Sequence, residues 1–368
     1  MKRILLICLL LPIFGFSQTR TSTMDGDFFN PLIWNPLGLP TSGETIIINH
    51  NVVLNTAVYY TSGSITINAG GSLIEDAVDR TFWADGTGSV VNHGTFTTHL
   101  LALSPGASFT NDGDFINIDS LWNQGTITNT GTATLFDIWN DLTGTFTNSG
   151  NLTNADSLLN QGVLINNGSA TVYDILNDQL ASFTNNGMFD ITNNMNNQGY
   201  VNNQAGIRIE NDFSNCNTQS MDAMFINDGR FCVSNDMINC QGDTLTGSGS
   251  YYIGGFSSNF GVFDGTHFFY TSSGTVGIPG NIQPGVTLAV GSCNLTIDEL
   301  QQGYSVYPNP VSSLLHLSVS DIGYELYDIS GKLVKAGEVE NYTINLNDLN
   351  AGTYMLKVDE GVKRIIKE

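Results

Sequence analysis

Residues 109–145 read FTNDGDFINIDSLWNQGTITNTGTATLFDIWNDLTGT, and this stretch determines how the chain folds. Its opening pattern FTNxG returns at residues 146 and 183, so the repeating unit is 37 residues long. A related pattern at 127–131 divides the unit into two rungs of 18 and 19 residues. Regular repetition at this period predicts a solenoid, in which each rung satisfies its backbone only by stacking on its neighbours.

Apolar residues recur at steps of six within the unit, at Phe109, Phe115, Leu121, Ile127, Ala133 and Trp139. No helix has this period, so we expect three short strands per rung, with rungs about 4.8 Å apart. The fold class is therefore predicted to be all-β, with a single-stranded parallel β-helix. A strict hexad would indicate a left-handed β-helix, whereas the extra residue in each 37 favours a right-handed one. Trp122 and Trp139 are expected to be core residues, and exposure of either in a groove would instead favour glycan binding.

An asparagine occupies the same position of successive rungs, and a glycine usually follows two residues later. The asparagines are Asn92, Asn111, Asn129, Asn148, Asn166, Asn185 and Asn203. Asparagine tolerates turn conformations, and its amide can bond the rungs above and below. We predict that the column builds a corner of the solenoid; the alternative is a row of amides that contacts a glycan.

Composition limits the partners of this 368-residue chain. It has 12 Lys and Arg against 34 Asp and Glu, a formal net charge of −22 and a pI of about 4.2. This charge excludes nucleic acid as a partner and disfavours anionic glycans and lipids, whereas neutral glycans, divalent cations and basic proteins remain compatible with it.

The chain divides into five expected segments. Residues 1–18 combine Lys2 and Arg3 with a short apolar run and are typical of a secretory signal peptide. Residues 19–84 are predicted to be an N-terminal β cap, 85–230 the solenoid repeats, 231–300 the last rungs and their cap, and 301–368 a separate β-domain. Caps cover the open strand edges at the two ends of a solenoid.

Four cysteines follow the signal segment: Cys216, Cys232, Cys240 and Cys293. An even number in an oxidising compartment predicts two disulfides, with three pairings open. The alternative is a zinc site, but there is no CxxC pair and no histidine at ligand spacing.

The last segment contains several ordered motifs separated by turn signals. Its alternating strands predict a small Ig-like β-sandwich. The motif residues are Tyr307, Pro308, Asn309, Pro310, Asp328, Gly331, Gly352, Tyr354, Lys363, Arg364 and Lys367. These motifs resemble the C-terminal sorting domain of proteins exported by the type IX secretion system of Bacteroidetes. The resemblance implies the secretion machinery as a partner, an extracellular or outer-membrane surface location, and release or attachment to surface lipopolysaccharide.

Four aspartates, Asp119, Asp137, Asp156 and Asp174, lie 18 or 19 residues apart. If they stack about 4.8 Å apart, they repel one another unless water or a cation screens them. Hydrated turns are the favoured interpretation, and a row of Ca²⁺ sites is the alternative; no other cofactor is expected.

No catalytic motif stands out in the chain. The repeat resembles the right-handed β-helices of bacterial surface adhesins and of polysaccharide-cleaving enzymes. We therefore expect an exported β-helix that functions in adhesion or glycan contact without catalysis. The alternative is a β-helix hydrolase of neutral glycans, in which the same aspartates would supply the acid and the base.

Overall fold

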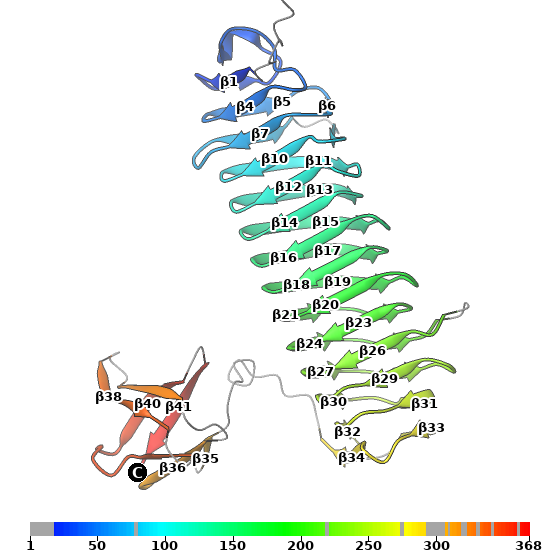
Figure 1. Cartoon of the computed structure of the whole chain (residues 1–368), viewed down its shortest axis with the longest axis vertical. Helices are drawn as coiled ribbons and strands as arrows, with labels where there is room; N and C mark the ends of the chain where they lie inside the picture. The colour runs from blue at the N-terminus through cyan, green and yellow to red at the C-terminus, as the bar shows by residue number, and fades with distance from the viewer. Residues whose placement is uncertain are drawn as a thin grey trace, which may run out of the picture. The chain divides into compact units, whose positions relative to one another are not determined.

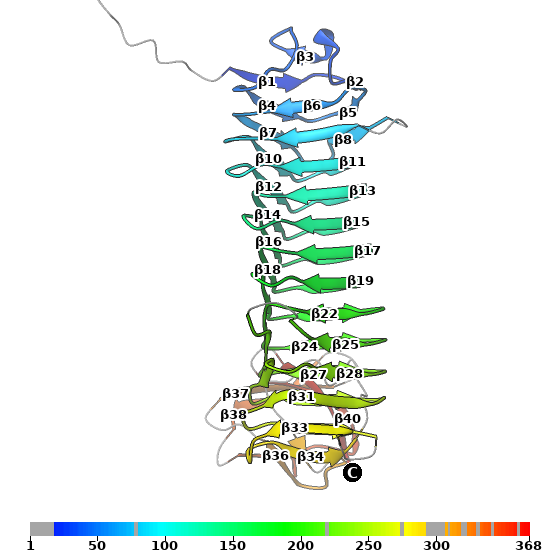
Figure 2. The same ribbon diagram turned by 90° about the vertical axis from the view of Figure 1, so that its right-hand side faces the viewer.

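The computed structural model describes residues 18–76, 80–217, 221–272, 276–291, 306–307, 310–317, 322–328, 332–339, 342–358 and 361–368. Residues 1–17 of the signal segment, Pro308, Asn309, Gly331 and Cys293 lie outside these residues. Two compact units divide the chain, residues 1–293 and 294–368. The first unit is a parallel β-solenoid, as predicted, whose rungs stack along one axis (Figures 1 and 2).

Each rung contributes one short strand to the first sheet. Its strands are β1 (Thr19–Ser22), β4 (Thr45–Ile48), β7 (Ser64–Ile67), β10 (Ser89–Asn92), β12 (Ser108–Asn111), β14 (Thr126–Asn129), β16 (Thr145–Asn148), β18 (Val163–Asn166), β20 (Ser182–Asn185), β23 (Tyr200–Asn203), β26 (Met224–Asn227) and β29 (Thr244–Thr246). Consecutive members pair in parallel, beginning with Thr19 opposite Thr45. The parallel register therefore starts well before residue 85, inside the segment expected to be a cap.

The second and third sheets complete the rung. Strands of the second sheet are β2 (Gly26–Asp27), β5 (Asn51–Leu54), β8 (Ser72–Glu75), β21 (Met188–Ile191), β24 (Gly206–Ile209), β27 (Arg230–Val233), β30 (Ser250–Ile253), β32 (Phe268–Thr271) and β34 (Thr287–Val290). Strands of the third are β6 (Val58–Tyr60), β9 (Thr81–Ala84), β22 (Met195–Asn197), β25 (Phe213–Asn215) and β28 (Met237–Asn239). At the C-terminal end, β31 (Ser257–Phe263) pairs with β28 and β29, and β33 (Ile278–Ile282) pairs with β31.

Five longer strands belong to both the second and the third sheet: β11 (Thr95–Leu103), β13 (Asp114–Asn123), β15 (Thr132–Asn140), β17 (Asn151–Asn160) and β19 (Ser169–Asn177). A register shift in the middle of each pairing marks the corner between the two sheets. Strands β13 and β17 have 10 residues and β15 has 9, so β13 and β17 carry one more residue at this bulge. The 19-residue rung contains the shorter strand β15 and is lengthened instead at the turn that follows it, residues 141–144.

Inward-facing side chains form continuous columns along the axis. Phe109, Ile127, Phe146, Leu164 and Phe183 lie in register on successive rungs, and each is at most 1% exposed. Burial of one such side chain is worth about 1.5–3 kcal/mol, and repetition multiplies this gain along the solenoid. At the N-terminal end, the short helix η1 (Pro31–Ile33) and β3 (Trp34–Asn35) cover the first rung.

The second unit is a small antiparallel β-domain, as predicted. One sheet contains β35 (Val306–Tyr307), β36 (Leu314–Leu317) and β39 (Thr343–Asn345). The other contains β38 (Leu333–Glu338), β37 (Gly323–Asp328), β40 (Gly352–Val358) and β41 (Gly361–Lys367). Residues of both sheets share one buried cluster that includes Leu315, Leu326 and Leu356.

Candidate functional site

The outer face of the third sheet carries an aromatic column. Trp83 lies opposite Tyr59 and Ala102, and Ala102 lies opposite Trp122. Trp122 in turn lies opposite Trp139, and Leu159 and Leu176 continue the column. Trp122 is 41% exposed and Trp139 46% exposed. We call these seven residues the aromatic column.

The indole rings of Trp122 and Trp139 are stacked, with centroids 5.8 Å apart and an interplanar angle of 22°. Each indole N–H donates a hydrogen bond: from Trp122 to Asp141 Oδ2 at 3.2 Å and from Trp139 to Gln161 Oε1 at 3.1 Å. These bonds fix the ring planes. A pair of exposed apolar rings held in this way is a candidate binding surface.

The expectation that Trp122 and Trp139 are core residues is wrong. In β13 and β15 the inward residues are Leu121, Asn123, Ile138 and Asn140, so each tryptophan between them points outward. Because β15 lacks the extra residue of β13, its core residue comes one position earlier than a step of six predicts. A shift of one residue in a strand moves a side chain to the opposite face.

Polar residues flank the aromatic column on one side. Ser120 lies opposite Asp137, and Ser157 lies opposite Asp174. The Ser157 hydroxyl donates to Asp137, while Asn193 Nδ2 and Asn194 N donate to Asp174 at 3.1 and 2.8 Å. Thus the four predicted aspartates do not form one column, because Asp119 and Asp156 lie in the bulges of β13 and β17. Serine separates the carboxylates, and calcium binding by the four stays a prediction.

Asp141 borders the other side of the column. Gln124 Nε2 donates to Asp141 Oδ2 at 2.7 Å, and this bond is the main reason why the pKa of Asp141 is below its ordinary value. The N–H groups of Leu142 and Trp122 lower it further, while partial burial opposes the shift. The carboxylate is therefore ionised at neutral pH and repels anionic ligands.

Two shallow hollows continue the same face toward the C-terminal rungs. The first, of about 280 Å³, is lined by residues that include Leu159, Asp174 and Leu176. The second, of about 490 Å³, is lined by residues that include Asn196, Ser214 and Phe256. A ligand that lies along the solenoid axis would therefore meet the stacked aromatic rings first and the two hollows beyond them.

The predicted asparagine column lies inside the solenoid. Each amide Nδ2 donates to the Oδ1 of the next asparagine: Asn92 to Asn111 and Asn111 to Asn129 at 2.7 Å, and so on to Asn227. All are at most 1% exposed, so the corner prediction is confirmed and a glycan-contacting amide row is excluded for this column. Such a fully bonded polar network is stabilising in a low-dielectric interior.

A second buried asparagine column was not predicted. It contains Asn123, Asn140, Asn160, Asn177, Asn197, Asn215, Asn239 and Asn259, again joined from amide to amide. The recurring Asn-Gln-Gly at 123, 160 and 197 was the available signal, but alternate spacings of 17 and 20 residues hid the members between.

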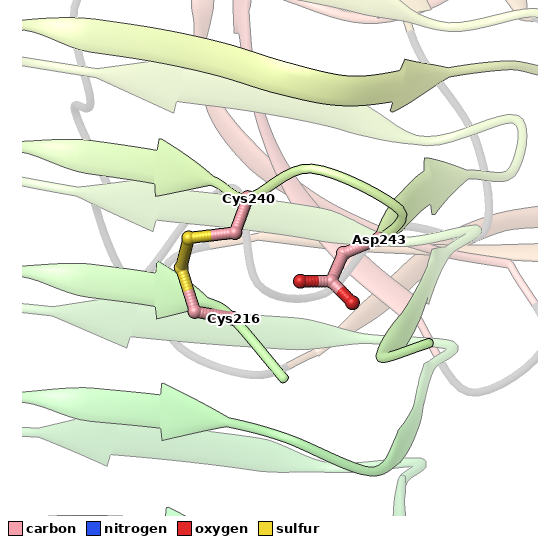
Figure 3. A group of neighbouring side chains, drawn as sticks. All are labelled: Cys216, Cys240 and Asp243. Carbon is pink, nitrogen blue, oxygen red and sulfur yellow. A yellow bond between two sulfur atoms is a disulfide. The ribbon is translucent and has the colours of Figure 1, made fainter. Parts of the chain in front are cut away.

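Cys216 and Cys240 form a disulfide, which confirms the expectation of disulfide bonding. Cys232 is disulfide-bonded as well. Asp243 lies beside the Cys216–Cys240 bridge (Figure 3) and accepts backbone hydrogen bonds from Ala223 and Asn217. Burial raises the pKa of Asp243 above its ordinary value. Among the described residues, Cys216, Cys240 and Asp243 are the one group of three that could hold a metal ion, and the disulfide occupies both sulfur atoms.

The motif residues of the second unit are distributed over its strands. Asp328 closes the β37–β38 hairpin, where its Oδ1 accepts from Lys332 N at 3.1 Å. Tyr354 on β40 is buried and donates its hydroxyl proton to the Asn350 carbonyl at 2.8 Å. Gly352 begins β40, Tyr307 ends β35, and Lys363, Arg364 and Lys367 belong to β41, whereas Pro310 is exposed. The hydrogen bonds of Asp328 and Tyr354 therefore stabilise the fold of this small domain.

Comparison with known protein families decides what this unit is. Residues 305–368 match the family described as "Secretion system C-terminal sorting domain". The second unit is a sorting domain. As a type IX sorting domain, it implies interaction with that secretion machinery and export to the cell surface or the extracellular space. No curated protein and no solved structure matches the chain significantly. Among the described residues, no helix is long and apolar enough to cross a membrane.

Proposed function

We propose that the exported β-solenoid binds neutral glycans through the aromatic column and thereby functions in adhesion, without catalysis. The exposed, stacked pair Trp122 and Trp139 is the observation that carries the proposal. Binding sites combine apolar and aromatic surface with a few convergent polar groups, and the column is bordered by Asp141 and Gln161.

Charge narrows the class of glycan. Asp137, Asp141 and Asp174 lie beside the column, and the whole chain has a formal net charge of −22. An acidic polysaccharide would be repelled by this field. The rungs repeat about every 4.8 Å, so an extended neutral chain along the axis can contact several rungs at once.

The proposal is tested with an array of neutral and acidic oligosaccharides probed with the secreted protein. We expect the protein to bind neutral chains, with an affinity that rises as the oligosaccharide becomes longer. Trp122→Ala and Trp139→Ala should each lower this affinity. Absence of binding across the array, together with unchanged cell attachment in a deletion strain, would contradict it.

Glycan hydrolysis is the second candidate, because the carboxylate of Asp174 lines the first hollow and Asp137 lies two rungs away on the same side. Two rungs correspond to about 9.6 Å, near the upper end of the spacing used by inverting glycosidases. Release of reducing ends from neutral glycans that is abolished by Asp137→Asn or Asp174→Asn would favour hydrolysis over simple contact.

A further inference from the structure

The outer face of the first sheet is rich in hydroxyl groups. Each of its four-residue strands points two side chains outward, and on β12, β14 and β16 these are Ser108 with Thr110, Thr126 with Thr128, and Thr145 with Thr147. The same Ser/Thr pairs recur on β1, β7, β20 and β29, as Thr19 with Thr21, Ser64 with Thr66, Ser182 with Thr184, and Thr244 with Thr246. We call the outward side chains of β1 to β29 in the first sheet the hydroxyl face.

The hydroxyl face carries no charged residue at any outward position of its described strands. On the other rungs, one or both outward residues are neither serine nor threonine: they are Ile47, Val91, Val163, Ile165, Tyr200, Asn202, Met224 and Ile226. Ile47 and Val91 share their strands with Thr45 and Ser89. In a chain with 34 acidic residues, this is an unusually neutral surface. The second sheet differs, since Asp114, Asp190, Arg208 and Arg230 point outward from it.

The central hydroxyl groups are available to solvent. Within the described residues, the side chains of Thr110, Thr126, Thr128, Thr145 and Thr147 are partly or fully exposed. None of them makes a side-chain hydrogen bond to another described group, in contrast with the threonines of the turns: Thr130 and Thr143 donate to backbone carbonyls. Each threonine of the face therefore presents a free hydroxyl beside a methyl group.

The array is also two-dimensional and in register. Ser108, Thr126 and Thr145 lie opposite one another without a register shift, as do Thr110, Thr128 and Thr147. The repeat is about 4.8 Å across strands and about 6.8 Å along them, because alternate residues share a face. The second sheet is also in register and presents Thr132, Thr134 and Thr153 on adjacent rungs, but charged side chains such as Asp114 and Asp190 interrupt that face.

A surface with these properties fits a periodic solid better than a single molecule. One small ligand would need one site, whereas here the pair of hydroxyl groups is present on seven rungs, and three of them, β12, β14 and β16, are consecutive. Crystalline polysaccharide is the less suitable solid, because such surfaces are held by aromatic rings and Tyr200 is the one aromatic residue of this face. Water ordered by alternating methyl and hydroxyl groups needs no charge, and an ionised side chain would disturb it.

We propose that the hydroxyl face binds ice. Methyl groups and hydroxyl groups in register order a layer of water with the repeat of the strands, and the stacked rungs hold these groups in place. This activity uses a different sheet from the aromatic column, so it stands independently of glycan binding.

The test measures incorporation of the secreted protein into slowly grown ice, and the freezing-point hysteresis it produces. Thr128→Lys/Thr147→Lys places two ammonium groups on adjacent rungs of the face. The matched control, Thr134→Lys/Thr153→Lys, makes the same change on adjacent rungs of the second sheet. Thermal unfolding by circular dichroism verifies that both variants fold.

We expect the wild type and the control to enter ice, and the variant of the hydroxyl face to lose about tenfold or more of its apparent affinity, because a charged group must be dehydrated at the contact. Three results would overturn the proposal: a wild type excluded from ice, equal loss in the two variants, or retention of ice binding by Thr128→Lys/Thr147→Lys. Self-association of the wild type that Thr128→Lys/Thr147→Lys abolishes, without ice binding, would assign the face to a second copy instead.

Discussion

Trp139 and Asn140 are neighbours in β15, but they belong to columns that behave differently along the solenoid. The interior column of Asn140 has asparagine on every rung from Asn123 to Asn259, and each side-chain amide donates a hydrogen bond to the next one. The exterior column of Trp139 changes from tyrosine and tryptophan to leucine and then to Asn196, Ser214 and Ile238. Interior regularity is required by the fold, whereas the exterior changes along the axis, and the proposed glycan site lies on the part that carries the tryptophans.

The largest expected effect comes from breaking the interior. Asn140→Ala removes the acceptor of Asn123 Nδ2 and the donor to Asn160 Oδ1 and to the Val163 carbonyl, and it leaves a cavity. We expect a loss of about 3–4 kcal/mol in the free energy of unfolding, since buried polar groups are left without partners. The thermal unfolding midpoint measures this loss. A midpoint equal to that of the wild type would show that the ladder does not stabilise the rungs.

A smaller effect is expected where the interior regularity is interrupted by the insertion after Asn215. The Cys216–Cys240 disulfide closes a loop of 24 residues there, and the pair Cys216→Ser/Cys240→Ser should destabilise the C-terminal rungs by about 2–3 kcal/mol. Limited proteolysis should then cut first near these rungs, while the rungs before residue 200 stay protected. Cleavage spread evenly along the solenoid would contradict this local role.

Changing the exterior should affect binding and not stability. Trp139→Ala removes one ring of the stacked pair and is expected to weaken neutral-glycan binding about tenfold, or 1.4 kcal/mol. Titration calorimetry measures the affinity, and Thr134→Ala on the second-sheet part of the same strand is the matched control. Equal affinities of Trp139→Ala and wild type would place the glycan elsewhere.

The smallest effect concerns the N-terminal end, where Arg20 takes a core position of β1, opposite Ile46, and forms a buried ion pair. Arg20 Nη2 lies 2.7 Å from Glu44 Oε1, both side chains are buried, and the hydrogen bond from Arg20 is the main reason why the pKa of Glu44 is lowered. A lowered pKa in the folded state stabilises the protein above the unfolded pKa of about 4.3, and that stabilisation is lost as the pH falls through the folded value.

We therefore expect the difference in thermal midpoint between wild type and Glu44→Gln to be present at pH 6 and to shrink as the pH falls below about 4. Other carboxylates also titrate in this range, so the comparison of the two proteins isolates Glu44. A difference that is constant from pH 6 to pH 3 would show that the pair is not ionised in the folded protein.

Sequence reasoning succeeds here where a physical requirement is copied on every rung. The Phe109, Phe146 and Phe183 column, the Asn92 to Asn203 column and the parallel register all follow from regular spacing. The sorting domain is also predictable, because its motifs occur in a fixed order.

The face of Trp139 was not predictable from the same spacing, whereas Trp122 follows Leu121, an inward position that the step of six does predict. The orientation of Trp139 depends on where the extra residue of its rung lies, which is the turn after Asn140 and not the strand itself. The prediction of a single aspartate column is wrong for a related reason. Equal spacing in the sequence placed Asp119 and Asp137 in one column, but the bulge in β13 moves Asp119 out of register. Periodicity determines which rung a residue belongs to, and the bulge determines which way it points.

One experiment tests the separation of interior and exterior most directly: thermal unfolding and neutral-oligosaccharide titration of both Asn140→Ala and Trp139→Ala. The account predicts that Asn140→Ala lowers the unfolding midpoint by several degrees. Trp139→Ala should leave the midpoint unchanged and lower the affinity for the oligosaccharide. If Trp139→Ala instead destabilised the protein as much as Asn140→Ala and left glycan affinity intact, the tryptophan would be a structural residue and the account would be wrong.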